Sequence, residues 1–210
     1  MAEAGFLKDL LVLLPDKDME QCVKGALDRN SALEIARISC DIFVHRNRDP
    51  GCLREGAEFL RPFKSQYEHA LVMFDYNGCG QEDHMPSELE QMVTKRLCDS
   101  GWGQRAEALI IVPELEAWVW SDSPHVAACL HWNNEKLGGL REWLIAENFL
   151  LPDKSKPKYP KAALEAALRA TRTPRTSALY RALADSVSFA RCTDTSFVRF
   201  KTLLQRWFGT

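Results

Sequence analysis

The chain has 210 residues and a formal net charge of −2, and 46% of its residues are hydrophobic and 27% charged. This composition is that of a globular protein with one sizeable core and excludes a disordered chain. No apolar run approaches the roughly 20 residues of a membrane-spanning helix. The seven cysteines include no CxxC pair, and residues 1–5 lack the basic start of a signal peptide. We therefore expect a cytoplasmic protein that makes no membrane contact.

Four short apolar runs predict strands that are buried on both faces, as in a parallel sheet. In chain order they are residues 10–14, 38–44, 70–74 and 108–112. The third run is the clearest, because it leads directly into the turn sequence that begins at Asp75. The fourth is ended by Pro113. Their shortness and the polar residues between them favour strands separated by helices.

Helical patterns follow each of these strands. Residues 16–29 carry apolar side chains at helical spacing, with Asp16 or Asp18 as the N-cap, and residues 87–98 open with a capping box at Ser87 and Glu90. The predicted helices are 16–29, 50–60, 87–98, 114–120, 137–148, 160–170, 177–184 and 195–208. The pattern predicts an α/β fold with a parallel sheet of about four strands flanked by helices. We expect a core at 1–135 and a helical C-terminal extension at 136–210, packed together as one compact unit.

Acidic residues follow three of the four predicted strands. The side chains at these strand ends are Asp16, Asp18 and Glu20, then Asp75 and Asn77, then Glu114 and Glu116. Ligands of open parallel sheets bind at the carboxyl ends of the strands. Carboxylates that converge there repel one another unless a hard cation such as Mg²⁺ neutralises them. One or two such ions can activate water and polarise a phosphodiester, so this arrangement points to metal-assisted phosphoryl chemistry.

Each acid also has a local explanation. Asp16 can cap the first helix, Asp75 and Asn77 can form an Asx-type turn, and Glu114 can favour a helix N-terminus through the helix dipole. Their coincidence at three strand ends of one sheet favours a shared site over three separate roles.

Basic residues are concentrated late in the chain. Between Asp153 and Arg181, eight residues are basic and two are acidic. This segment is either a solvated helix surface or a phosphate-facing patch beside the acidic site. The candidate lysines for nucleic-acid binding are Lys154, Lys156, Lys158 and Lys161. Arg46 and Arg48 follow the second strand and either hold a phosphate or lie in a solvated loop.

Zinc is not expected. The available residues are Cys79, His84, His125, Cys129 and His131, and they lack the spacing of a four-ligand zinc site.

Two segments, residues 74–78 (FDYNG) and 112–118 (VPELEAW), resemble Toprim-like families of unknown function found in bacterial defence loci. In those families a strand ends in Asp-x-Asp-Gly, and a later strand leads into a Glu-Ala-Trp helix. Residues 160–165 and 195–200 look like the helices that follow the Toprim core there. The resemblance implies a Toprim-like (Rossmann-like) fold, Mg²⁺-dependent chemistry on nucleic acid, and other defence-system proteins as partners.

Two positions depart from the family pattern. Toprim enzymes place a Glu-Gly pair after the first strand, where the Glu serves as acid and base, and here Asp16 takes that place with a shorter reach. The second acid of the Asp-x-Asp motif is Asn77, whose amide can ligate Mg²⁺ but brings no charge. We expect Asp75, Asn77 and Glu116 as metal ligands, with Asp16 and Glu114 as catalytic groups.

Two functions follow from this resemblance. The first is a Mg²⁺-dependent nuclease, or a related phosphoryl-transfer enzyme, acting in antiviral defence. The second is a catalytically degenerate Toprim domain that senses nucleic acid or nucleotide, or that scaffolds a defence complex.

Overall fold

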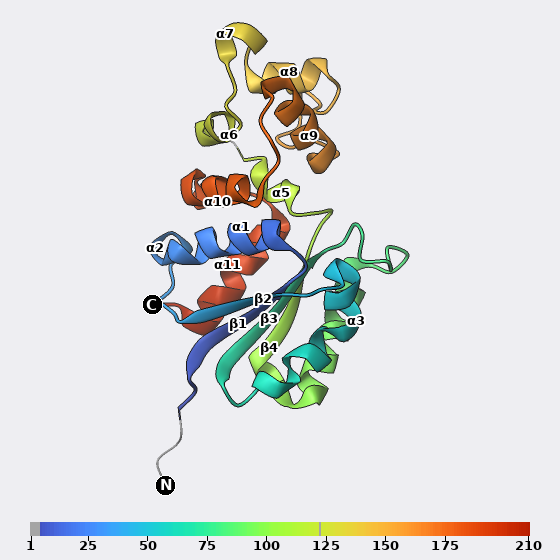
Figure 1. The fold of residues 1–210 in the computed structure, drawn as a ribbon, viewed down its shortest axis with the longest axis vertical. Coiled ribbons are helices and arrows are strands. Elements are labelled where there is room, and N and C mark those ends of the chain that lie inside the picture. Colours follow the sequence, from blue (N-terminus) through green and yellow to red (C-terminus); the bar gives the residue numbers. More distant parts are fainter. Residues whose placement is uncertain (1–4, 122) are drawn as a thin grey trace.

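The computed structural model describes residues 5–121 and 123–210, so most of the segment on which the signal-peptide expectation rests, residues 1–4, lies outside it. Within the described residues, four parallel strands form one sheet in the order β2-β1-β3-β4 (Figure 1). The strands are β1 (Lys8–Leu14), β2 (Cys40–Val44), β3 (Tyr67–Asp75) and β4 (Ala106–Ile111). The α/β class and the parallel four-stranded sheet are therefore confirmed.

Helices cover both faces of the sheet, which explains why the strand sequences are apolar at every position. In β1, Leu10 and Val12 belong to one apolar cluster, and Leu11 and Leu13 belong to the other. The first cluster is closed by α1 (Lys17–Asp28), α10 (Ser177–Ser186) and α11 (Thr195–Phe208), and the second by α3 (Arg48–Leu60) and α4 (Pro86–Leu97). Figure 1 shows α1 and α11 on one side of the sheet and α3 on the other.

The remaining helices are short, except α9, and several lie beyond the carboxyl ends of the strands. They are α2 (Asn30–Leu33), α5 (Glu116–Val119), α6 (Pro124–Cys129), α7 (Asn134–Leu137), α8 (Leu140–Ala146) and α9 (Pro160–Thr171). Single turns of 3₁₀ or π type occupy Arg61–Phe63, Cys98–Trp102, Gly103–Arg105 and Phe189–Arg191. In Figure 1, α6 to α9 form the end of the molecule farthest from the sheet, whereas α11 returns to the sheet and α10 packs on α1. The segment 136–210 therefore contributes both to this end and to one face of the sheet.

The N-cap of α4 differs from the prediction, because it is Met85 and not Ser87. The helix begins at Pro86, and the Glu88 side chain accepts a hydrogen bond from the Met85 N–H at 3.1 Å, so the capping box predicted at Ser87 and Glu90 is wrong. Glu90 instead turns towards the edge strand β4, where its Oε1 accepts from the Ile110 N–H at 2.8 Å. A side chain that satisfies an edge-strand N–H removes a point at which another chain could pair with the sheet.

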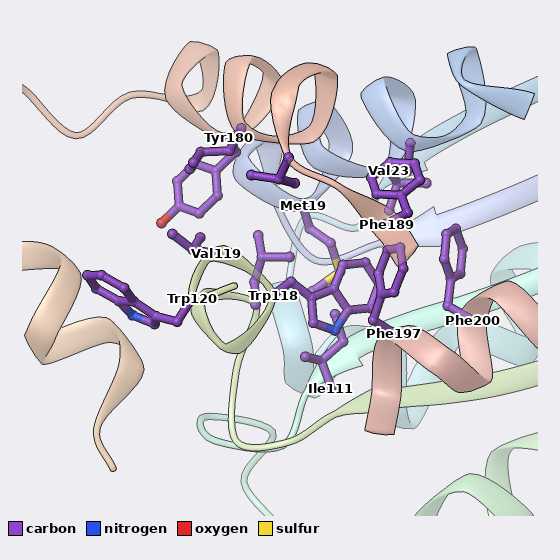
Figure 2. Packing of buried hydrophobic residues seen from close by; sticks show 14 of the residues in the cluster. Met19, Val23, Ile111, Trp118, Val119, Trp120, Tyr180, Phe189, Phe197 and Phe200 are labelled. Carbon is purple, nitrogen blue, oxygen red and sulfur yellow. The ribbon is translucent and has the colours of Figure 1, made fainter. Parts of the chain in front are cut away.

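An aromatic cluster fixes the position of α5 over the sheet. The Trp118 ring packs against Phe197 and Phe200 of α11, with ring centroids 5.1 and 5.5 Å apart (Figure 2). Its indole N–H donates to Ser196 Oγ at 2.8 Å, so the buried polar atom is also satisfied. These contacts hold the first residue of α5, Glu116, at the carboxyl edge of the sheet. No helix in the described part of the chain combines the length and the apolar composition that crossing a bilayer requires.

Candidate functional site: an acidic edge of the sheet

Asp75 is the centre of a group of acidic residues at the carboxyl edge of the sheet. It ends β3, and its Oδ1 accepts a hydrogen bond from the Leu115 N–H at 2.9 Å. Loss of water around the carboxyl raises the pKa of Asp75 well above its ordinary value. The negative charges of four neighbours add to this rise; in order of effect they are Asp49, Glu116, Asp16 and Glu114. The structure therefore brings together acids from the ends of all four strands.

Asp49 was not predicted as a member of this group. It lies in the first turn of α3, which follows β2, and its Oδ1 accepts from the backbone N–H of Asp75 at 2.9 Å. Burial raises the pKa of Asp49, and the charge of Asp16 contributes to the rise. The signal for Asp49 in the sequence is its place after the second strand, since acids gather at the carboxyl ends of parallel strands.

Glu116 is neutralised by groups from the C-terminal half of the chain. It is 2% exposed, and its Oε1 accepts from Tyr180 Oη at 2.6 Å and lies 2.8 Å from Arg175 Nη2. In Figure 2 the Tyr180 hydroxyl points away from the aromatic cluster. Arg175 lies between α9 and α10 and also pairs with Asp18 at 3.2 Å and with Glu165 at 3.3 Å. A guanidinium thus engages Glu116, one of the three side chains that the sequence assigned to a metal ion.

Asp16 and Glu114 combine a local role with a place in the acidic group. Asp16 is the N-cap of α1, and its Oδ1 accepts from the Met19 N–H at 2.9 Å. Glu114 is 8% exposed, and its Oε1 accepts from the Lys161 N–H at 3.1 Å, in the first turn of α9. Burial raises the pKa of Glu114, and the charge of Glu116 adds to the rise. The capping role of Asp16 is therefore confirmed, whereas Glu114 accepts at the start of α9, which is distant in the chain, and not at the start of the helix that follows it.

The cap gives a direct test of the local role of Asp16. Asp16→Ala is expected to lower the free energy of unfolding by about 1 kcal/mol, because the Met19 N–H loses its acceptor at the start of α1. Asp16→Asn keeps an oxygen acceptor and is expected to unfold with wild-type stability. Urea titration of the three proteins measures both differences, and equal stability of all three would contradict the capping role.

Asn77 and most of the predicted basic residues lie outside this group. Asn77 is exposed, and its backbone N–H donates to the Pro113 carbonyl at 2.9 Å. Arg46 lies between β2 and α3, Arg48 is the first residue of α3, and both are exposed. Lys154 is exposed and pairs with the adjacent Asp153 at 3.2 Å, and Lys158 lies over the Tyr159 ring at 5.2 Å.

Lys156 and Lys161 have different surroundings. Lys156 is tied into the fold, since its Nζ donates to the Ala117 carbonyl at 2.8 Å and pairs with Asp194 at 3.1 Å. Lys161 is exposed, and its positive charge partly offsets the burial that raises the pKa of Glu114 and of Asp49. Of the predicted lysines, Lys161 is the one whose charge acts on the acidic group.

The oxygen donors of the group fit a hard cation such as Mg²⁺ in their chemistry. Among residues 5–121 and 123–210, however, no group of three or more His, Cys, Asp or Glu side chains is arranged to hold a metal ion. Arg175 and Tyr180 already engage Glu116. A ligand set that includes Glu116 would require Arg175 to move away, and Mg²⁺ binding stays a prediction.

The fold and the site define a parallel α/β protein with an acidic site at the carboxyl edge of its sheet. Comparisons with protein-family models, with curated proteins and with solved structures find no match for this chain.

Proposed function

We propose that the chain is a Toprim-like component of a bacterial antiviral defence system and that its acidic edge acts with Mg²⁺ on phosphodiester or phosphate groups, as a nuclease or a related phosphoryl-transfer protein. The observation that carries this proposal is the placement of Asp75 among carboxylates from all four strand ends. The sequence motifs at 74–78 and 112–118 support it, as does their likeness to the small Toprim-like component of the methylation-associated antiviral defence system.

The charge of the site explains why a divalent cation is proposed. Partly buried carboxylates of like charge raise one another's pKa and destabilise the ionised state, and a hard cation removes that repulsion. When bound, Mg²⁺ would polarise a phosphodiester and stabilise the charge on the leaving oxygen. Asp75 and Glu116 would hold it, and Lys161 would attract the phosphate.

Glu114 has the properties of a proton-transfer group. Its raised pKa brings its protonation closer to neutral pH, where a general acid or base is most effective. Asp16 faces the same group of acids and would serve as the alternative, so Glu114→Gln and Asp16→Asn separate the two roles without removing the α1 cap.

The test is cleavage of DNA and RNA, single- and double-stranded, with Mg²⁺ or Mn²⁺ and with a chelator. Asp75→Asn is expected to lower metal-dependent cleavage about 100-fold, as loss of a metal-supporting group does. Asp153→Asn is the matched control, because it removes one exposed carboxylate outside the acidic site and should cleave at the wild-type rate. Cleavage that survives the chelator, or that Asp75→Asn retains, would exclude the mechanism.

A second function is favoured by two observations: Asn77 brings no charge and is exposed, and Glu116 is already paired with Arg175. Both suit a degenerate domain that senses nucleic acid or nucleotide, or that scaffolds a complex of defence proteins. Phage challenge of cells that carry the complete defence locus distinguishes the two. Protection that persists in Asp75→Asn cells supports the binding module, and protection that disappears while the protein remains folded and abundant supports the enzyme.

A further inference from the structure

Three arginines line a pocket next to the acidic edge. The pocket lies where α9 ends and the following loop turns towards the sheet, and its guanidinium groups come from Arg169, Arg172 and Arg175. Arg169 and Arg172 are exposed, and within the described residues neither guanidinium forms an ion pair or a hydrogen bond. Arg175, in contrast, is held by Glu116, Asp18 and Glu165. Glu165 also lines the pocket, where its carboxylate pairs with Arg175. The pocket therefore contains two unpaired arginines beside one that is shared with the acidic site.

Local structure alone does not account for this concentration of charge. One cation in the last turn offsets the partial negative charge of a helix C-terminus, and Arg169 already stands in the last turn of α9. Arg172 occupies the C-cap with φ of 56°, a left-handed conformation that favours glycine or asparagine. Arg172 at this position therefore adds a second positive charge to the pocket, and its guanidinium has no pairing partner among the described residues.

We propose that this arginine pocket binds phosphate groups of a nucleic acid or nucleotide and that the bound phosphate draws Arg175 away from Glu116. Guanidinium groups bind phosphate oxygens through two parallel hydrogen bonds, which makes arginine the side chain best suited to this exchange. The substrate class rests on the proposed function, whereas phosphate binding by the arginines is independent of whether the protein cleaves anything.

The exchange couples the pocket to the acidic edge. Glu116 is 2% exposed, so departure of Arg175 would leave a buried carboxylate with only the Tyr180 hydroxyl as partner. An uncompensated buried charge is unfavourable, and a divalent cation at the acidic edge would replace the lost guanidinium. Binding of phosphate and binding of the cation therefore favour each other, and thermodynamic linkage requires the effect to be reciprocal.

Phosphate binding is tested with two probes, a short fluorescent oligonucleotide and ATP, both in the presence of EDTA. The double substitution Arg169→Gln with Arg172→Gln is expected to weaken binding and to lower the salt dependence of log affinity by about one unit per arginine. The control double substitution, Arg37→Gln with Arg61→Gln, removes two exposed arginines that do not line the pocket. Loss confined to the oligonucleotide identifies a nucleic-acid site, and loss confined to ATP identifies a nucleotide site. Equal affinities of the two double variants would overturn the proposal.

The exchange of Arg175 is tested by removing the carboxylates that hold it. In EDTA, Glu116→Gln is expected to bind the phosphate probe several-fold more tightly than the wild type, because Arg175 is released from a buried charge. Asp18→Asn should act in the same direction, and its 24% exposed side chain keeps the test valid if Glu116→Gln fails to fold. Unchanged affinity in the folded variants would contradict the exchange. Since none of these measurements requires cleavage, failure of the nuclease assay and failure of this inference are separate results.

Discussion

Arg175→Met is expected to lower the free energy of unfolding by about 3 kcal/mol at neutral pH, because it leaves the Glu116 carboxylate buried without its cation. The expected loss is at the lower end of the range for broken buried ion pairs, since the Arg175 side chain is 31% exposed. Urea titration followed by tryptophan fluorescence measures the change, and Trp118, which belongs to the same cluster as Tyr180, reports on this part of the core.

Two variants show whether the loss comes from the ion pair. Adding Glu116→Gln to Arg175→Met removes the orphaned charge and should restore most of the lost stability, so that the double-mutant cycle shows strong coupling. Arg181→Met is the matched control, because Arg181 pairs with the largely exposed side chains of Asp28 and Asp185. That substitution should cost no more than about 1 kcal/mol. Equal stability of the two single variants would show that Glu116 does not depend on Arg175.

Asp75→Asn is expected to make the protein more stable at neutral pH, by about 1–2 kcal/mol, the usual size of a stabilising substitution. Asparagine keeps an oxygen that can accept from the Leu115 N–H and carries no charge among the other carboxylates. A gain of stability at a residue proposed to act on substrate would mean that the wild-type side chain is retained for function at a cost to folding.

The gain depends on pH in a defined direction. Burial raises the pKa of Asp75 in the folded protein, so the folded state holds a proton that the unfolded chain has already lost. Wild-type stability therefore falls as the pH rises from the ordinary aspartate value through the raised folded value. Asp75→Asn lacks this fall, and the two proteins should converge in stability below the ordinary value of 3.8.

The free energy of unfolding is measured over a series of pH values for the wild type, Asp75→Asn and Asp153→Asn. Asp153→Asn removes an exposed carboxylate, so it separates the effect of the buried Asp75 from a general reduction in negative charge. Lower stability of Asp75→Asn than of the wild type at neutral pH would refute the account. If Mg²⁺ binds at Asp75, saturating Mg²⁺ should reduce the difference in stability between Asp75→Asn and the wild type. The reason is that a ligand that binds only the folded wild-type protein stabilises that protein.

Much of the architecture was predictable from local sequence patterns. The apolar runs became β1 to β4 because a strand covered by helices on both faces needs an apolar side chain at every position. The helix at 195–208 was predicted with its observed bounds, and of the two predicted candidates for the α1 cap, Asp16 and Asp18, the structure shows Asp16. The capping box predicted at Ser87 and Glu90 does not form, because the Glu90 carboxylate accepts a hydrogen bond from the Ile110 N–H of β4 instead.

The gathering of acids at one edge followed from the order of residues along the chain, because parallel strands all present their carboxyl ends on the same side of the sheet. The groups that neutralise these acids, in contrast, come together only in the folded chain. Tyr180 and Glu116 are 64 residues apart, and Arg175 reaches the same carboxylate from the loop before α10. No local pattern encodes that meeting, since it depends on α10 packing against α1 and thereby bringing a distant guanidinium to a buried acid.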